Sequence, residues 1–235
     1  MKKNKQELRT TLGLILIYVV CMSVFESQCP EQWMERMRVI PVALVLALQV
    51  FVIYKRKDTV SIGLYRTKQV PGKETLYFIP LIILATANLW HGVVIRYDVM
   101  TMALSIIGML LVGFVEEILF RGFLFQALMR RSVKIAIIVS TLTFGLGHGV
   151  NFLNGAEFAP TILQIIYALA IGLMLSVFAF KTGNILPCCI FHGVFNALAV
   201  FSNEEGQTMV YQVIVCVVIS LIAVGYAWYM WKVTK

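Results

Sequence analysis

Six polar side chains lie inside segments that are otherwise apolar, and their types suit acid–base chemistry. An ionisable group near the centre of a membrane span costs at least about 2.5–3.5 kcal/mol on insertion scales, so a group that is kept there is a candidate for function. A carboxylate can act as a general base toward water, and imidazole and amide groups can donate to a developing oxyanion. Such a set suits hydrolysis of an amide bond. The six residues are Glu116, Glu117, Arg121, His148, His192 and Asn196.

The spacing of these residues predicts how they pair. Glu117 and Arg121 are four residues apart, so on a helix they share a face and can form an ion pair. Glu116 points about 100° away from Glu117, which leaves it without a partner on its own helix. His192 and Asn196 are also four residues apart and share a face. We therefore expect the carboxylate of Glu117 to be paired with Arg121 and the carboxylate of Glu116 to remain available for acid–base chemistry.

Three separate segments place ionisable groups at a similar depth. At a rise of about 1.5 Å per residue, Glu116 lies about 21 Å along its helix from Arg130, and His148 lies about 21 Å from Lys134. His192 lies about 17 Å from Lys181 by the same rise. A lone buried histidine is more often a hydrogen-bonded packing residue than a ligand, and a Glu–Arg pair can simply pin two helices together. The matched depth favours a common site, where one carboxylate and two imidazoles meet.

The composition excludes an ordinary soluble enzyme, a disordered chain and a disulfide-stapled secreted module. Of 235 residues, 60% are hydrophobic and 14% are charged, whereas soluble domains average about 45–50% and about 25%. We predict an all-α, polytopic helical membrane bundle of about eight transmembrane helices. It forms a single integral membrane domain over residues 1–235, with the motif core at 113–200. The expected apolar segments are 11–25, 39–54, 75–94, 99–120, 133–150, 160–180, 185–201 and 208–231.

The distribution of Lys and Arg predicts the orientation. With the N-terminus inside, sixteen of the twenty basic residues lie in inner loops and tails, and Arg36, Arg38 and Arg96 lie in outer loops. By the positive-inside rule, we expect a multi-pass protein of the plasma membrane with both termini cytoplasmic and an even number of spans. The net charge is +8, but the basic residues lie in short loops between apolar runs. We therefore expect membrane lipids, and no nucleic acid, as partners.

Three motifs in the apolar segments resemble those of a known family, the CPBP intramembrane proteases. They read Glu116-Glu117-x-x-x-Arg121, Phe144-x-x-x-His148 and His192-x-x-x-Asn196. Their order fits that family, as do the gaps of 32 and 44 residues between the first glutamate and the two histidines. The family comprises CAAX-processing and bacteriocin-processing enzymes, also called Abi proteins, and includes the type II CAAX prenyl endopeptidases. The resemblance implies an intramembrane endopeptidase that acts on a peptide or lipidated protein.

The resemblance also implies a role for each motif residue. Glu116 matches the general base that activates water, and His148 matches the residue that helps to hold that water. His192 and Asn196 match a pair that stabilises the oxyanion. The supporting residues of the family match Glu117 and Arg121.

A divalent metal, with Zn²⁺ as the first candidate, is a further implication of the resemblance. If a metal is bound, His148, His192 and Glu116 are its expected ligands. A glutamate-activated water without a metal is the alternative. The spacing rules for zinc do not choose between the two, because the three residues come from separate helices.

Two other functions stay open. A non-catalytic bacteriocin self-immunity or partner-binding membrane protein could keep the same residues for structure, and loss of function on Glu116→Gln would separate an enzyme from it. A proton-coupled transporter could relay protons through buried Glu and His. It is disfavoured because the sequence has no inverted repeat or proline-interrupted pair of spans. For an endopeptidase we expect the site to open toward the cytoplasm or the bilayer.

Overall fold

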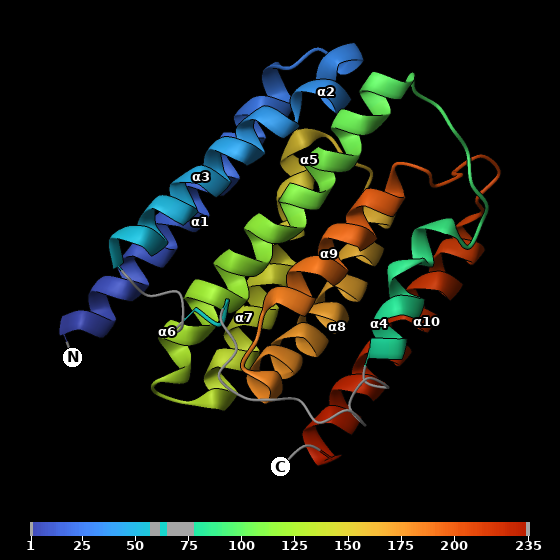
Figure 1. Ribbon diagram of the computed structural model, residues 1–235. Helices are drawn as coiled ribbons and strands as arrows, with labels where there is room; N and C mark the ends of the chain where they lie inside the picture. The colour runs from blue at the N-terminus through green and yellow to red at the C-terminus, as the bar shows by residue number, and fades with distance from the viewer. Residues whose placement is uncertain (1, 57–61, 65–77, 234–235) are drawn as a thin grey trace.

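The structure is a computed structural model that describes residues 2–56, 62–64 and 78–233. Within these residues every regular element is a helix, which confirms the predicted all-α class. The α-helices are α1 (Lys2–Gln28), α2 (Glu31–Met37), α3 (Val39–Arg56), α4 (Ile79–Ala85), α5 (Val99–Glu117), α6 (Phe125–Met129), α7 (Val133–Gly147), α8 (Phe158–Thr182), α9 (Leu186–Ala199) and α10 (Met209–Val233) (Figure 1). Three short segments differ from α-helix. The tighter 3-10 helices are η2 (Ala87–Leu89) and η4 (His148–Asn154), and the wider π-helix is η3 (Ile118–Leu124).

Six helical stretches in the described residues are long and apolar enough to cross a membrane, so the chain is a multi-pass membrane protein. Two further apolar helices, Ile79–Leu89 and Leu186–Ala199, are shorter. At 1.5 Å per residue they are about 16 and 21 Å long, less than the roughly 30 Å hydrocarbon core. The count of eight crossings therefore stays a prediction. The six stretches are Gln6–Gln28, Glu31–Arg56, Val99–Met129, Val133–Asn154, Phe158–Thr182 and Met209–Lys232.

The expected segment 75–94 differs most from the structure. Residues 75–77 lie outside the described residues, and the helical part ends at Leu89. Beyond it Gly92 has φ of 123°, a conformation that favours glycine, and Val93 forms an isolated bridge with Ser202. Hydropathy alone does not register this turn, because the apolar residues continue through it.

The helices pack around a common hydrophobic core with α5, α8 and α9 near its centre. Helix α5 contacts α9 and α3, and α8 contacts α7 and α10. Helix α1 runs beside α3 along one side of the bundle and also contacts η3, α6 and η4, while α4 and α10 lie together on the other side (Figure 1). Of the six long stretches, the one in α1 buries the smallest share of its length.

Polar caps define where two central helices begin. The carboxylate of Asp98 caps α5 by accepting hydrogen bonds from the backbone nitrogens of Met100 and Thr101, and Arg36 of α2 pairs with it at 2.6 Å. Hydrogen bonds from the Thr101 hydroxyl and from Arg36 hold the pKa of Asp98 well below its usual range. Ser132 caps α7 in a similar way. These caps set the starts of the helices that carry the first two motifs.

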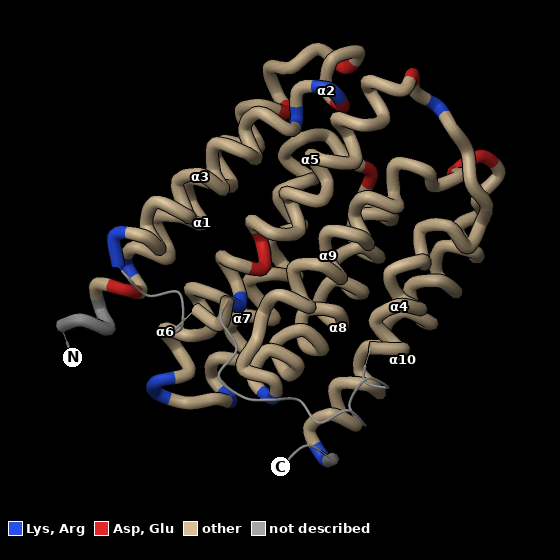
Figure 2. The backbone as a smooth tube through the Cα atoms, in the orientation of Figure 1, with Lys and Arg blue, Asp and Glu red and all other residues tan. Residues whose placement is uncertain are grey.

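Both ends of the described chain lie at the same end of the bundle, opposite α2 (Figure 1). Most Lys and Arg residues are at the end with the termini (Figure 2). Most Asp and Glu residues are at the opposite end, around α2 and the loop before α10 (Figure 2). This arrangement agrees with an even number of crossings.

A close approach of α5 and α9 depends on glycine. A Cβ atom on Gly113 of α5 would lie 2.3 Å from the backbone nitrogen of Gly193 in α9, so a larger residue cannot fit without moving a helix. Small residues allow such close packing of membrane helices. Gly113 lies one turn before Glu117, and Gly193 directly follows His192. The glycine contact therefore brings the first and third motifs together.

We expect Gly113→Ala to lower the free energy of unfolding by about 1–3 kcal/mol, the usual cost of overpacking a close contact. The matched control is Gly225→Ala in α10, where an added Cβ would have no atom within 4 Å. That variant should be unchanged or slightly more stable, because alanine has the higher helix propensity. Thermal unfolding in detergent compares the two. Equal stability would contradict the close α5–α9 contact.

Candidate active site

A buried ion pair connects the first motif to two neighbouring helices. Arg121 Nη1 lies 2.6 Å from Glu117 Oε1, and both side chains are 0% exposed. Arg121 Nη2 donates to the carbonyl of Gly172 in α8 at 3.1 Å, and the guanidinium lies 4.3 Å from the ring centre of Phe144 in α7. The structure thus confirms the pairing that the four-residue spacing predicts. The same arginine ties α7 and α8 to the end of α5.

Arg121 lies in the π-helical turn η3 rather than in regular α-helix. Such wider turns occur frequently at functional sites. The hydroxyl of Ser140 in α7 donates to the carbonyl of Phe120 at 2.9 Å, which gives this turn a polar partner. A Cβ atom on Gly172 would lie 3.0 Å from Phe144 and 3.3 Å from Arg121 Nη2. The absence of a side chain on Gly172 therefore makes room for the guanidinium.

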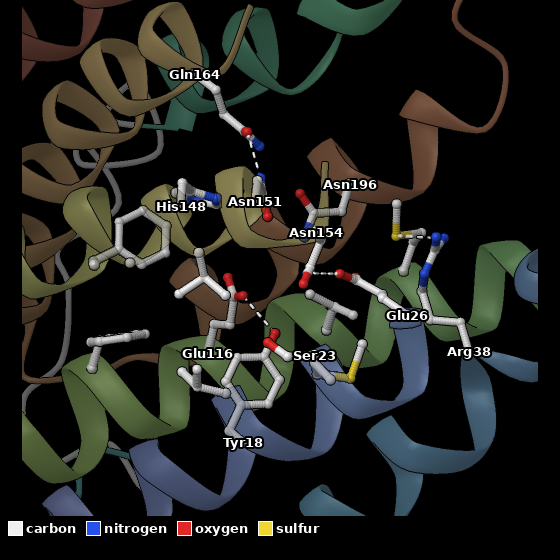
Figure 3. Close-up of a pocket in the computed structure, with 18 of the residues that line it drawn as sticks. Tyr18, Ser23, Glu26, Arg38, Glu116, His148, Asn151, Asn154, Gln164 and Asn196 are labelled. Atoms are coloured by element: carbon white, nitrogen blue, oxygen red, sulfur yellow. Dashed lines mark hydrogen bonds between the residues drawn. The ribbon is translucent and has the colours of Figure 1, made fainter. Parts of the chain in front are cut away.

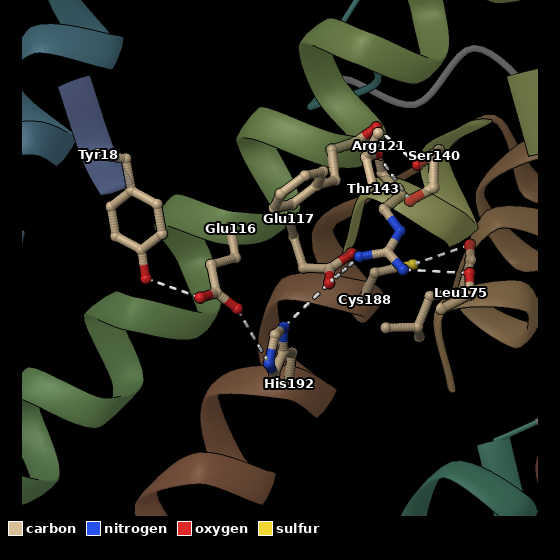
Figure 4. A network of polar contacts seen from close by, with 11 residues as sticks. Tyr18, Glu116, Glu117, Arg121, Ser140, Thr143, Leu175, Cys188 and His192 are labelled. Carbon is tan, nitrogen blue, oxygen red and sulfur yellow. Dashed lines mark hydrogen bonds and ion pairs between the residues drawn. The ribbon is translucent and has the colours of Figure 1, made fainter. Parts of the chain in front are cut away.

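His192 of α9 lies between the two adjacent carboxylates (Figure 4). Its Nδ1 is 2.9 Å from Glu117 Oε1, and its Nε2 is 3.5 Å from Glu116 Oε2. Because Glu117 is paired with Arg121 it is an acceptor, so Nδ1 of His192 carries the donated proton. Nε2 then faces Glu116, where a proton can be exchanged.

The two carboxylate oxygens of Glu116 have different surroundings. Oε1 accepts a hydrogen bond from the hydroxyl of Tyr18 in α1 at 2.6 Å. Oε2 is buried and makes no hydrogen bond to any described residue. A buried polar atom without a partner costs free energy and calls for an explanation. Because Glu116 lines a cavity, Oε2 is the natural acceptor for a water molecule or a substrate group.

Phe144 spaces the two histidines around the site. Its ring centre is 5.4 Å from that of His148 and 5.4 Å from that of His192, in both cases edge to face. His148 is the first residue of η4, where α7 changes to a tighter turn, and it lines the same cavity as Glu116 (Figure 3).

The cavity has a volume of about 310 Å³ (Figure 3). From Glu116 its walls follow α1, α5 and η4 to Glu26 and Arg38, which lie near α2. It therefore leads to the end of the bundle opposite the chain termini (Figure 1). The sequence predicts cytoplasmic termini and a site that opens toward the cytoplasm or the bilayer. With this cavity, a cytoplasmic opening and cytoplasmic termini would lie at opposite ends of the bundle, whereas an opening toward the bilayer does not conflict with such termini. Four carboxamides also line the walls, those of Asn151, Asn154, Gln164 and Asn196.

The structure brings all six predicted site residues into one region. Four of them line the cavity, and the Glu117–Arg121 pair is buried beside His192. Sequence reasoning missed Tyr18. A tyrosine in an apolar segment is usually span filler or an interfacial residue, and no spacing rule connects it with a carboxylate 98 residues away. The residues that line the cavity are Glu116, His148, His192 and Asn196.

The expected metal ligands do not form a metal site as they are placed. The described part of the chain contains no group of three or more His, Cys, Asp or Glu side chains arranged to hold an ion. His192 directs Nδ1 to Glu117, and the ring of His148 packs against Phe144. Glu116 Oε2 and His192 Nε2 face each other at 3.5 Å. As these side chains are placed in the described residues they do not form a metal site, so the metal stays a prediction and we derive no step through one.

The fold and the site define a polytopic helical membrane protein with a carboxylate–histidine network beside a cavity. Residues 98–198 match the family described as type II CAAX prenyl endopeptidase Rce1-like. This segment contains all six predicted site residues, and the match supports the resemblance to CAAX proteases that the three motifs indicate. No curated protein matches the chain. Helix α1, with Tyr18, lies outside the matched residues.

We expect Arg121→Leu to destabilise the protein by about 3–5 kcal/mol, because it leaves the carboxylate of Glu117 buried without its charge partner. The control is Arg131→Leu, at an exposed position between α6 and α7, which should change stability by less than about 0.5 kcal/mol. Thermal unfolding of the purified variants makes the comparison. Two equally stable variants would contradict the buried pair.

Proposed function

We propose that the protein is an intramembrane endopeptidase that hydrolyses a peptide bond of a membrane-associated or lipidated peptide, with Glu116 as the general base. One observation carries this proposal. Glu116 lines a cavity together with two histidines and four carboxamides, and its Oε2 is buried without a hydrogen bond, 3.5 Å from His192 Nε2. The match of residues 98–198 to a family of prenyl endopeptidases supports the same reaction class.

In the proposed reaction a water molecule donates a hydrogen bond to Oε2 of Glu116. As the water oxygen forms a bond with the carbonyl carbon, Glu116 takes the proton, and a tetrahedral intermediate with a negatively charged oxygen results. Glu116 then returns that proton to the amide nitrogen while the C–N bond breaks. The products are a new carboxyl terminus and a new amine, and the carboxylate of Glu116 is regenerated.

The remaining motif residues act around this carboxylate. His192 and Asn196 are one turn apart on α9 and line the cavity. The amide of Asn196 can donate to the oxyanion, and Nε2 of His192 can donate when it carries a proton in addition to the one on Nδ1. His148 lines the cavity from η4 and helps to hold the water. Glu117 keeps a proton on Nδ1 of His192, and Arg121 holds Glu117 in place. The buried pair thus orients the histidine without touching substrate.

The substrate reaches the site as an extended peptide segment. Carboxamide side chains both donate and accept hydrogen bonds, so those on the cavity walls can pair with peptide groups. With the termini in the cytoplasm of a plasma-membrane protein, as the Lys and Arg residues at that end favour, the cavity faces the outer side of the membrane. A peptide would then enter from the outer side or laterally from the lipid.

We expect Glu116→Gln to lower the cleavage rate by about 10²–10⁴-fold, the usual contribution of a general base. Purified protein in liposomes is incubated with a mixture of prenylated and unmodified peptides, and products are read by mass spectrometry. Glu157→Gln, at an exposed position before α8, is the matched control and should cleave like wild type. Absence of cleavage by folded wild type would favour a non-catalytic immunity or partner-binding role.

Removal of divalent metal tests the proposed metal-free base. Because the described residues contain no group of three ligands arranged to hold an ion, we expect protein treated with EDTA or 1,10-phenanthroline to keep its activity. Elemental analysis of the purified protein should find no stoichiometric zinc. Stoichiometric zinc, together with activity that is lost on chelation and restored by added zinc, would establish the alternative in which His148, His192 and Glu116 hold a metal.

A further inference from the structure

We propose that Tyr18 is a positioning residue for Glu116. Its hydroxyl holds Oε1, so that Oε2 stays directed at the cavity and His192. This inference rests on the proposed function and adds a functional residue from α1, outside the segment that matches the protease family.

Tyr18 supplies the hydrogen bond that orients the carboxylate. Among the described residues it is the one hydrogen-bond donor to Glu116, at 2.6 Å. This distance is typical of a hydroxyl that donates to an ionised carboxylate, and such bonds are about twice as strong as neutral ones. The bond lies inside the bundle, where a low dielectric strengthens it further. Without it, the polar contact left to the Glu116 carboxylate among the described residues is the longer one, 3.5 Å, between Oε2 and His192 Nε2.

Polar contacts at three levels seat α1 against the rest of the bundle. Near its start, Glu7 pairs with Arg130 at 2.7 Å. Near its end, Glu26 accepts a hydrogen bond from Asn154 of η4. Tyr18 lies between these contacts, and at 100° per residue the three positions fall within about 100° of one another on the helix. Because α1 buries little of its length, these contacts set its register against the neighbouring helices. They thereby set the position of the Tyr18 hydroxyl along the bundle axis.

The ring and the hydroxyl of Tyr18 have separable parts in the site. The ring forms part of the cavity wall, whereas the hydroxyl contacts Glu116. Replacement by phenylalanine keeps the wall and removes the donor. A positioning role therefore predicts a change in turnover with little change in substrate binding.

The experiment measures kcat and KM for Tyr18→Phe with a peptide that wild type cleaves. We expect kcat to fall by about 10- to 100-fold, the range that corresponds to loss of a hydrogen bond to a charged group, while KM stays close to wild type. Tyr54→Phe is the matched control, because Tyr54 of α3 is 76% exposed, and it should leave both constants unchanged.

A second variant separates positioning from a general loss of structure. Glu7→Gln removes the contact with Arg130 near the start of α1, while the contacts of Glu26 with Asn154 and of Tyr18 with Glu116 still hold the helix in register. It should therefore lower the unfolding temperature and keep kcat. An unchanged or raised kcat in Tyr18→Phe would overturn the inference. An equal fall of kcat in Glu7→Gln would also overturn it, because the loss would then result from weaker packing of α1 and not from the missing hydroxyl. Inactive but folded wild type would instead overturn the proposed function itself.

Discussion

The buried pair of Glu117 and Arg121 is the interaction on which the rest of the site depends. Both side chains are fully buried, so neither charge can be left without a partner at acceptable cost. Arg121 reaches a carbonyl of α8 and a ring of α7, and Glu117 reaches His192 of α9. One pair of charges therefore holds four helices at a common level. The glycine contact between α5 and α9 makes this geometry possible, because it lets His192 approach the carboxylates.

Two glutamates that are neighbours in sequence have opposite tasks. The turn of about 100° between adjacent helical residues directs Glu117 into the protein and Glu116 toward the cavity. Glu117 is held by a cation and an imidazole, and so it is a structural acceptor. Glu116 is held on one oxygen by Tyr18 and leaves the other without a hydrogen bond. His192 contacts both, which connects the buried support to the reactive carboxylate.

Local spacing predicted much of this site, and long-range geometry could not be predicted. The ion pair follows from a separation of four residues, and the meeting of Glu116 and His192 follows from their matched depth. The contact with Tyr18 could not be predicted, because nothing in a single sequence connects positions 98 residues apart. The direction of the cavity also depends on how α1 and η4 sit against α5. Hydropathy located the apolar segments, but the turn at Gly92 shortened one of them.

Hydrolysis with Glu116 as the general base requires this residue to face the scissile bond at the inner end of the cavity. The most direct test is an experimental structure of Glu116→Gln with an uncleaved substrate peptide in a lipid environment. We expect an extended peptide in the cavity, with its scissile carbonyl within hydrogen-bond distance of His192 or Asn196. We also expect a water molecule between the carbonyl carbon and the side chain at position 116. A peptide bound elsewhere, or a scissile bond out of reach of position 116, would contradict the account.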